Sequence, residues 1–270
     1  MLTVVLLGAG RVASHLGPAI VRAGCQVSYV WSRSLASAQA LAALLPGAVA
    51  GTSLDLRAHP ADLYLISVPD AVIPAVLAEA AFPPASLVAH TSGALPLALF
   101  TAYPGLRGGV FYPLQTFSME KPIEWQTVPL CVEAADKQGE AMLLVLARAL
   151  SQQVILVATP QRQSLHVAAV FACNFPNHLL GISHALLAEA NLSFSLLEPL
   201  VRETIDKVFR FPPFTVQTGP AARQDEPTLA NHEAALGAHP GWLELYKALT
   251  TSIKAQAATL AENNEGPVQL

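Results

Sequence analysis

Residues 4–13 read V-V-L-L-G-A-G-R-V-A, and this stretch decides the fold of the N-terminal half. Four apolar residues run without interruption into Gly8, Gly10 and Ala13. An unbroken apolar run of this length is typical of a strand buried on both faces of a parallel sheet. We therefore expect a buried strand, a glycine turn and a helix over residues 12–23.

The spacing G-x-G-x-x-A is the small-residue variant of the fingerprint that binds dinucleotides. Gly8 permits the tight turn, Gly10 lets a pyrophosphate approach the backbone, and Ala13 lets the helix pack closely on the strand. The first N–H groups of the helix, at Arg11 and Val12, have no intrahelical partner and can face the phosphates. The alternative is a tight strand–helix turn that binds no ligand.

The end of the second predicted strand, residues 26–31, distinguishes between the two nicotinamide cofactors. A site that prefers NAD usually places Asp or Glu there to bind the ribose 2′-OH. This chain instead has Ser32, Arg33 and Ser34. An arginine and two hydroxyls can hold a 2′-phosphate, which favours NADP over NAD. The alternatives are a solvated charge for Arg33 and an N-cap of a helix over residues 35–45 for Ser34.

Alternation of strands and helices continues to about residue 157 and predicts a Rossmann-type, mostly parallel α/β sheet. The further elements are expected as strands at 62–68, 87–90, 109–112, 128–132 and 154–157, and as helices at 71–81 and 137–150. Ligands bind at the carboxyl ends of such strands, where polar residues gather here: Ser67, Asp70, His90, Thr91, Ser92, Tyr112 and Gln115. Each also has a structural alternative, such as a helix start for Asp70.

The second half has no further strand pattern and predicts an all-helical domain. Helices are expected over residues 161–190, with a kink at Pro176, and over 193–211, 227–236 and 242–261. We accordingly expect a dinucleotide-binding domain over residues 1–158 and a helical substrate or dimerisation domain over 159–270.

Polar side chains on the first of these helices form a stripe, which comprises His166, Asn174, Asn177 and His178. Because such a stripe is costly to bury unpaired, it faces solvent, pairs across a dimer or lines a wet cleft. Arg223 and Asp225 lie in a later loop. They form either a local ion pair or a site for an anionic group of the substrate.

Composition restricts the class of protein further. The 270 residues are 53% hydrophobic and 13% charged, with a net charge of −4 and a pI near 6.0. This argues against a nucleic acid partner, which normally requires a basic patch. Three widely spaced cysteines form neither a disulfide framework nor a metal pattern and fit a reducing cytoplasm. We therefore expect no bound metal. A signal peptide is not expected, because no basic region precedes the N-terminal apolar run and the fingerprint follows it. A membrane span is not expected, because polar residues interrupt the apolar stretch 168–190.

Several motifs in order give the chain a recognisable pattern. After the glycine turn come V-P-D at 68–70, H-T-S-G at 90–93, F-Y-P-L-Q-T-F at 111–117, T-G-P-x-A-R-x-D at 218–225 and T-x-x-x-H at 228–232. Over nearly its whole length the chain resembles bacterial NADP-dependent oxidoreductases that join a Rossmann-like domain to a helical domain of unknown function. These are distant relatives of pyrroline-5-carboxylate reductase, ketopantoate reductase and the 6-phosphogluconate dehydrogenase-like group.

The resemblance implies NADP binding, a reductase-type fold and a homodimer through the helical domain, but it names no substrate. Two departures matter: the third motif usually reads F-H-P-L where this chain has Tyr112, and the helix over 161–190 lacks the lysine of hydroxyacid dehydrogenases.

We expect an NADP-dependent reductase of a small, anionic carbonyl or imine substrate, acting at a cleft between the domains. The nicotinamide is expected near Val68, Pro69 and Asp70 and near residues 90–92, facing Asn174 and His178 across the cleft. The candidate catalytic residues are His90 or His178 as proton donor, Asn174 and Ser92 as hydrogen-bond partners of the reacting group, and Arg223 as carboxylate ligand. The alternative is a non-catalytic NADP-binding sensor or scaffold with the same fold.

Overall fold

The computed structural model describes residues 1–118 and 121–264 and divides into two compact units, Met1–Phe175 and Pro176–Leu270. Unit 1 contains one sheet with the strand order β3-β2-β1-β4-β5-β6-β7-β8. Its strands are β1 (Thr3–Leu7), β2 (Gln26–Trp31), β3 (Val49–Gly51), β4 (Leu63–Ile66), β5 (Leu87–His90), β6 (Arg107–Pro113), β7 (Leu130–Ala134) and β8 (Val154–Leu156). All neighbouring strands are parallel except β6 and β7. The expected Rossmann-type, mostly parallel sheet is thus confirmed.

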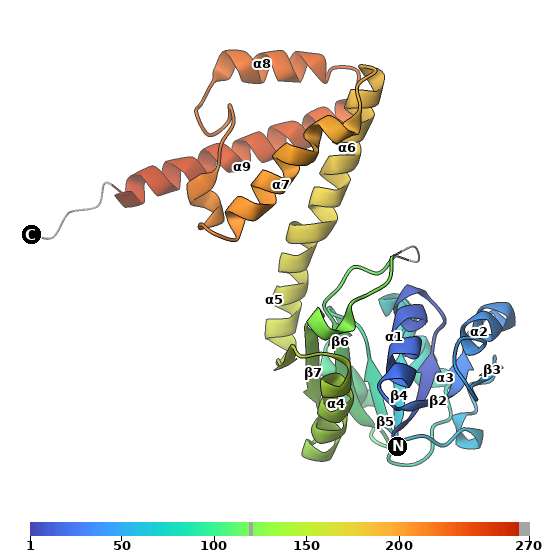
Figure 1. Ribbon diagram of the computed structural model, residues 1–270. Coiled ribbons are helices and arrows are strands. Elements are labelled where there is room, and N and C mark those ends of the chain that lie inside the picture. Colours follow the sequence, from blue (N-terminus) through green and yellow to red (C-terminus); the bar gives the residue numbers. More distant parts are fainter. Residues whose placement is uncertain (119–120, 265–270) are drawn as a thin grey trace, which may run out of the picture. The chain divides into compact units, whose positions relative to one another are not determined.

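Side chains of β1 alternate between two hydrophobic layers, as a strand with period two must. Val4 and Leu6 pack into the layer beneath α1, α2 and α4, while Val5 and Leu7 pack into the layer beneath α3. All four are fully buried, because helices cover both faces of the sheet (Figure 1). The helices of these layers are α1 (Arg11–Arg22), α2 (Leu35–Ala42), α3 (Ile73–Glu79) and α4 (Lys137–Leu150).

A long helical run begins after β8. It consists of α5 (Thr159–Ala169), a π-helical segment Val170–Asn174 and α6 (Phe175–Glu189). The sequence predicts a kink at Pro176, and the structure has a widened π turn directly before it. Proline lacks the N–H for an i→i−4 bond and its ring crowds the preceding turn, so a wider turn accommodates it.

Unit 2 is helical over its described residues, as expected for the second half. It contains most of α6, then α7 (Glu198–Val208), α8 (Glu226–Ala235) and α9 (Pro240–Asn264). Neither α6 nor α7 has a buried residue. The compact units divide between Phe175 and Pro176, whereas helical structure without strands begins at Thr159. The predicted boundary at 158 follows the change in secondary structure.

Candidate active site

The turn between β1 and α1 requires a glycine at its first position. Gly8 has a φ of +125°, and a Cβ there would lie 2.6 Å from the carbonyl oxygen of Ser67. The Gly8 N–H donates to the carbonyl of Trp31 at 2.8 Å. Gly8 therefore lets the turn pack directly against the ends of β2 and β4.

Gly10 differs from Gly8 because a Cβ at Gly10 would have no atom within 4 Å. This glycine is the N-cap of α1, no side chain caps the helix, and its first turn carries no acidic residue. Ala13, one turn on, is fully buried against the sheet. The protein itself leaves space at Gly10 that a side chain would fill. With the free N–H groups of Arg11 and Val12, this space fits an anionic group such as a pyrophosphate.

The end of β2 is held rigidly. The indole Nε1 of Trp31 donates to the carbonyl of Thr52 at 3.0 Å. The Ser32 hydroxyl oxygen accepts from the Ser34 N–H, and the Ser34 hydroxyl caps α2 by accepting from the Ser37 N–H, both at 3.3 Å. The capping alternative for Ser34 is thus observed, and the hydroxyl hydrogens of both serines are not used by these bonds. Arg33 is exposed and forms no ion pair within residues 1–118 and 121–264.

The V-P-D and H-T-S-G motifs meet at the ends of β4 and β5. The Ser92 hydroxyl donates to the carboxylate of Asp70 at 2.7 Å and accepts from the N–H groups of Ala94 and Leu95, each at 3.0 Å. A hydroxyl has one donor and two acceptor positions, so these three bonds occupy all of them. Ser92 therefore holds the loop after β5 in place. Asp70 follows Val68 and Pro69, which are half-buried and exposed.

His90 is fully buried beneath this loop. Its Nδ1 accepts from the Ser92 N–H at 3.2 Å, and its ring stacks on Phe100 with centroids 5.9 Å apart. Burial, with a smaller contribution from the nearby Arg162 charge, lowers the pKa of His90 to about 4. The imidazole is accordingly neutral at pH 7. These contacts favour a structural role for His90 over that of proton donor.

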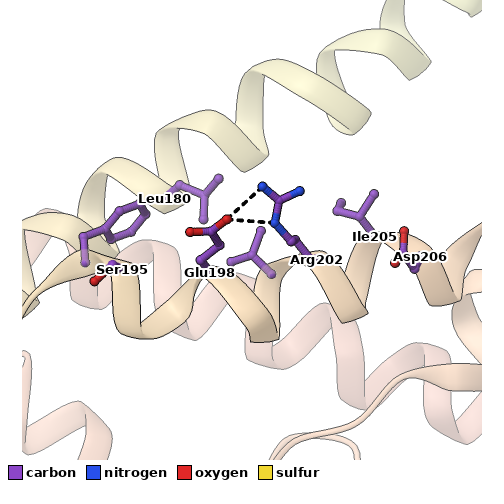
Figure 2. Close-up of a pocket in the computed structure, with 8 residues that line it drawn as sticks. Leu180, Ser195, Glu198, Arg202, Ile205 and Asp206 are labelled. Atoms are coloured by element: carbon purple, nitrogen blue, oxygen red, sulfur yellow. Dashed lines mark hydrogen bonds and ion pairs between the residues drawn. The ribbon is translucent and has the colours of Figure 1, made fainter.

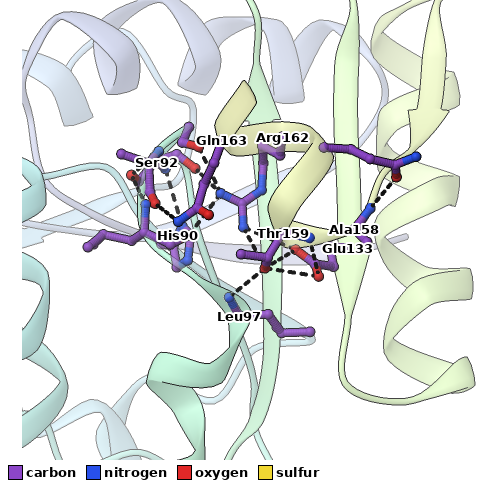
Figure 3. Close-up of polar contacts among 12 residues, drawn as sticks. His90, Ser92, Leu97, Glu133, Ala158, Thr159, Arg162 and Gln163 are labelled. Atoms are coloured by element: carbon purple, nitrogen blue, oxygen red, sulfur yellow. Dashed lines mark hydrogen bonds and ion pairs between the residues drawn. The ribbon is translucent and has the colours of Figure 1, made fainter. Parts of the chain in front are cut away.

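Arg162, in the first turns of α5, binds the other side of the same loop (Figure 3). Its guanidinium is fully buried and donates to three backbone carbonyls, those of Ser92, Gly93 and Leu95, at 2.8–3.2 Å. It also pairs with Glu133 on β7 at 3.0 Å. Buried charges need such partners, and this one joins the start of the long helix to the loop after β5.

Sequence reasoning missed Arg162 and Glu133. Glu133 also accepts from the N–H and hydroxyl of Thr159 at 2.8–3.0 Å, which fixes the start of α5. Most partners of Arg162 are backbone carbonyls about 70 residues away in sequence, so no local pattern marks them. The available signal was that Arg162 is the one charged residue among Lys, Arg, Asp and Glu over residues 159–188.

Tyr112 and His166 form a pair beside Gly93. The Tyr112 hydroxyl lies 3.1 Å from His166 Nδ1, with the rings edge to face. A Cβ at Gly93 would lie 2.6 Å from that Nδ1 and 2.7 Å from Tyr112 Cζ, so only glycine fits between them. Burial raises the pKa of Tyr112 to about 12, and its hydroxyl stays protonated at neutral pH. Tyr112 thus stands where the family that the chain resembles usually has histidine, and its hydroxyl is bonded to His166.

The remaining predicted residues lie elsewhere in the chain. Asn174 ends the π-helical segment and is exposed, His178 is exposed on α6, and Arg223 is exposed in the turn before α8. Asp225 accepts from the N–H and hydroxyl of Thr228 and so caps α8. No ion pair joins Arg223 to Asp225 within 4 Å among the described residues. Unit 1 therefore brings together Asp70, His90 and Ser92, whereas His178 and Arg223 belong to unit 2.

A doubly wound sheet with a glycine turn and an open helix N-terminus at its carboxyl edge defines a Rossmann-type protein. Family models agree: the Rossmann-like domain matches residues 1–104, and the "Domain of unknown function (DUF2520)" matches residues 128–253. A comparison with curated proteins gives no match.

Solved structures give closer relatives. A "putative NADP oxidoreductase" from Bacteroides fragilis is 36% identical, covers 94% of this chain and 98% of its own, and has a TM-score of 0.85. A "putative oxidoreductase" from Mycobacterium avium 104 is 17% identical, with 96% and 98% coverage and a TM-score of 0.62. The reductive aminase from Aspergillus terreus, solved with NADPH and ethyl levulinate, is 15% identical, with 97% and 99% coverage and a TM-score of 0.72.

The likeness to the last two relatives shows the fold alone. The 36% identity to the B. fragilis protein, over nearly the whole of both chains, shows the family. This chain belongs to the same family, in which a Rossmann-like domain precedes a DUF2520 domain. The family resemblance drawn from the sequence motifs is therefore confirmed.

Proposed function

We propose that this protein is an NADP-dependent oxidoreductase that reduces a small carbonyl or imine substrate. The observation that carries the proposal is the space at Gly10, in front of the uncapped N-terminus of α1. After the neighbouring strand β2 the chain has Arg33, where NAD enzymes usually have an acid. The relatives support it: one is named an NADP oxidoreductase and another was solved with NADPH. The prediction of NADP as cofactor agrees with both.

The residues that would hold NADP fall into three groups. Gly8, Gly10, Arg11, Val12 and Ala13 would bind the pyrophosphate through backbone N–H groups. Ser32, Arg33 and Ser34 would bind the 2′-phosphate through the guanidinium and the two free hydroxyl hydrogens.

Val68, Pro69 and Asp70, the third group, would lie beside the nicotinamide, which supplies the hydride when the cofactor is bound. Asp70 is fixed by Ser92, and the loop behind it is fixed by Arg162. The chain's own contribution at this edge is a rigid, preorganised wall, which is what positioning of a reactive group requires.

We further propose that the substrate is anionic, with Arg223 as ligand of its carboxylate and Asn174 and His178 beside the reacting group. What supports this assignment is that all three side chains are exposed and that Arg223 has no ion-pair partner in the described part of the chain. The alternative is a sensor or scaffold that binds NADP without turnover. Oxidation of NADPH in the presence of 2-oxoacids, imines and aldehydes separates the two.

The cofactor assignment is tested by fluorescence titration with NADPH and NADH. Arg33→Asp should raise the Kd for NADPH by about 30-fold or more, the equivalent of a lost charge-assisted bond, and change that for NADH little. Arg148→Asp makes the same charge change on an exposed arginine of α4 and is the matched control. An unchanged Kd for NADPH in Arg33→Asp would contradict the 2′-phosphate assignment.

We also propose a homodimer through the helical unit. Large apolar side chains of unit 2 are 48–85% exposed at Leu192, Leu196, Leu200, Ile205, Phe209, Phe211 and Phe214. Between α6 and α7 a groove of about 610 Å³ is lined by apolar Leu180, Phe194, Val201 and Ile205 and by polar Ser195, Glu198, Arg202 and Asp206 (Figure 2). Exposed apolar surface of this kind marks an interface. A second copy fits best because the same helices would supply apolar faces from both sides.

One helix, Thr159–Glu189, is long and apolar enough to cross a membrane by length and composition. Its first turns instead hold Arg162 in a buried network within unit 1, and His166 bonds to Tyr112. Asn174, Asn177 and His178 would be costly in lipid. These features support protein contacts over lipid for this helix.

A further inference from the structure

We infer that His166, held by Tyr112, delivers the proton that completes reduction at this site. The inference rests on the proposed function and assigns a step for which sequence reasoning favoured His90 or His178. The observation behind it is that the pair packs against Gly93 of the H-T-S-G motif, whose Ser92 binds Asp70.

The candidates in the loop itself are excluded by burial or by their bonds. His90 Nδ1 accepts from the Ser92 N–H, and its Nε2 has no partner but is buried away from solvent. The Ser92 hydroxyl has its donor and both acceptor positions occupied. Neither can release a proton to a substrate without breaking the packing of the loop.

His166 differs from these two residues in its exposure and in its hydrogen bonds. Its ring is half-buried, its Nδ1 is bonded to the Tyr112 hydroxyl at 3.1 Å, and its Nε2 has no hydrogen-bond partner among residues 1–118 and 121–264. The ring packs directly against the loop at Gly93, where a Cβ would collide with it. This leaves one nitrogen to orient the ring and the other to exchange a proton, the usual division of roles in a catalytic histidine.

Tyr112 keeps the ring in one orientation in either protonation state, because a phenol hydroxyl can donate and accept. In the imidazolium, Nδ1–H donates to the Tyr112 oxygen while Nε2–H faces outward. When the substrate carbon accepts a hydride from the reduced nicotinamide, the electron pair of its C=O or C=N bond moves to the oxygen or nitrogen. That atom takes the Nε2 proton, and neutral His166 keeps its Nδ1–H bond to Tyr112 and is reprotonated by solvent.

The charged and titratable groups around the pair come from four elements or loops. They are Asp70 after β4, Cys131 on β7, Arg162 on α5 and Cys173 in the π-helical segment. Glu133 compensates the charge of Arg162 through their ion pair, so that the buried arginine does not stand as an isolated cation beside His166.

The chain contains a matched control pair. In unit 2, His232 Nδ1 lies 2.9 Å from the Tyr246 hydroxyl with the rings edge to face. This pair has the same chemistry and nearly the same geometry without an H-T-S-G loop beside it. His232→Asn and Tyr246→Phe therefore report the general effect of breaking a His–Tyr bond in this protein.

The first measurement needs no substrate and uses the wild-type protein with ¹³C-labelled histidine rings. Saturating NADPH should move the His166 signal and leave that of His232 in place. NADP⁺ should move the His166 signal differently from NADPH, because the oxidised nicotinamide carries a positive charge that disfavours a nearby imidazolium. A His166 signal that NADPH leaves unmoved, although the fluorescence titration shows binding, would overturn the inference and leave the proposed function intact.

The second measurement is turnover of whichever carbonyl or imine the wild-type protein reduces. His166→Asn should lower kcat by about 100-fold or more, as loss of a general acid does, with the Kd for NADPH within about threefold of wild type. Tyr112→Phe should lower it less, by about tenfold, and shift the alkaline limb of the pH profile, where a proton donor loses its proton. Wild-type kcat in His166→Asn, or an equal loss in His232→Asn, would refute the assignment. Absence of NADPH binding by the wild-type protein would instead refute the proposed function, and the inference with it.

Discussion

At the scale of single residues, Arg162 determines more of this site than any residue of the fingerprint. It is fully buried and binds three carbonyls of the loop after β5, Glu133 and the Thr159 hydroxyl. A buried ion pair adds little over well-packed apolar residues, but removal of one partner leaves the other charge unpaired. Arg162 therefore matters chiefly for the shape of the loop that it holds.

Arg162→Met should destabilise unit 1 by about 3–5 kcal/mol, because it leaves the Glu133 carboxylate without its ion-pair partner and several buried carbonyls without a donor. The change is measured as the free energy of unfolding in urea. Arg57→Met removes an exposed ion pair with Asp55 and should change the free energy of unfolding far less, because solvent screens exposed pairs. Equal effects of the two substitutions would show that the network is not structural.

His90 should make stability depend on pH. The unfolded chain binds a proton at His90 near its ordinary pKa of 6.5, whereas the folded protein does so only near 4. The unfolded state therefore binds more protons between these two pH values. The contribution of neutral His90 to stability is complete above pH 6.5 and is lost as pH falls to about 4. The loss is of the order of 3 kcal/mol. His90→Asn should flatten the decline in urea unfolding free energy between pH 7 and 4, and an unchanged slope would contradict the buried neutral imidazole.

At the scale of elements, the two glycines of the β1–α1 turn have separable roles. Gly8→Ala should destabilise the fold by about 1–3 kcal/mol or more, because of the positive φ and the Ser67 carbonyl. Gly10→Ala should change stability by less than about 1 kcal/mol, because its Cβ has open space. It should nevertheless weaken NADPH binding about tenfold or more. Thermal unfolding and fluorescence titration of both variants check this, and it fails if Gly10→Ala binds NADPH as wild type does.

Hydrophobic patterning was sufficient to predict most elements. Residues 26–31, 87–90 and 137–150 were expected and are observed as β2, β5 and α4 with the same ends. The strand β3 was missed because three half-exposed residues at a sheet edge carry no pattern. The antiparallel pairing of β6 with β7 was also missed, since apolar residues encode burial and not strand direction.

The candidate site could be predicted only where a local motif reports it. The glycines and the meeting of V-P-D with H-T-S-G follow from the rule that ligands bind at the carboxyl ends of parallel strands. The roles within the loop could not be predicted, because the saturation of Ser92 and the burial of His90 arise from distant contacts. Placement of Asn174, His178 and Arg223 beside a substrate stays a prediction.

At the scale of the whole molecule, the exposed apolar side chains of α7 determine the expected assembly. If the protein forms the proposed dimer, of twice 28.4 kDa, Leu200→Asp should convert it to a monomer of 28.4 kDa in light scattering. The reason is that a charge cannot be buried in an apolar interface without a partner. Val145→Asp is the matched control, since Val145 on α4 is 63% exposed and Leu200 is 64% exposed. A monomeric wild-type protein would contradict the proposed interface.

The bonds of Arg162 determine where the chain can be cut to give an N-terminal fragment. Strand–helix alternation ends near residue 158, and a fragment cut there looks complete by sequence. Such a fragment would lack the guanidinium that closes the loop after β5 and the Thr159 groups that bind Glu133. A fragment that keeps these bonds must therefore extend beyond residue 158 into α5, which belongs to the same compact unit as the sheet.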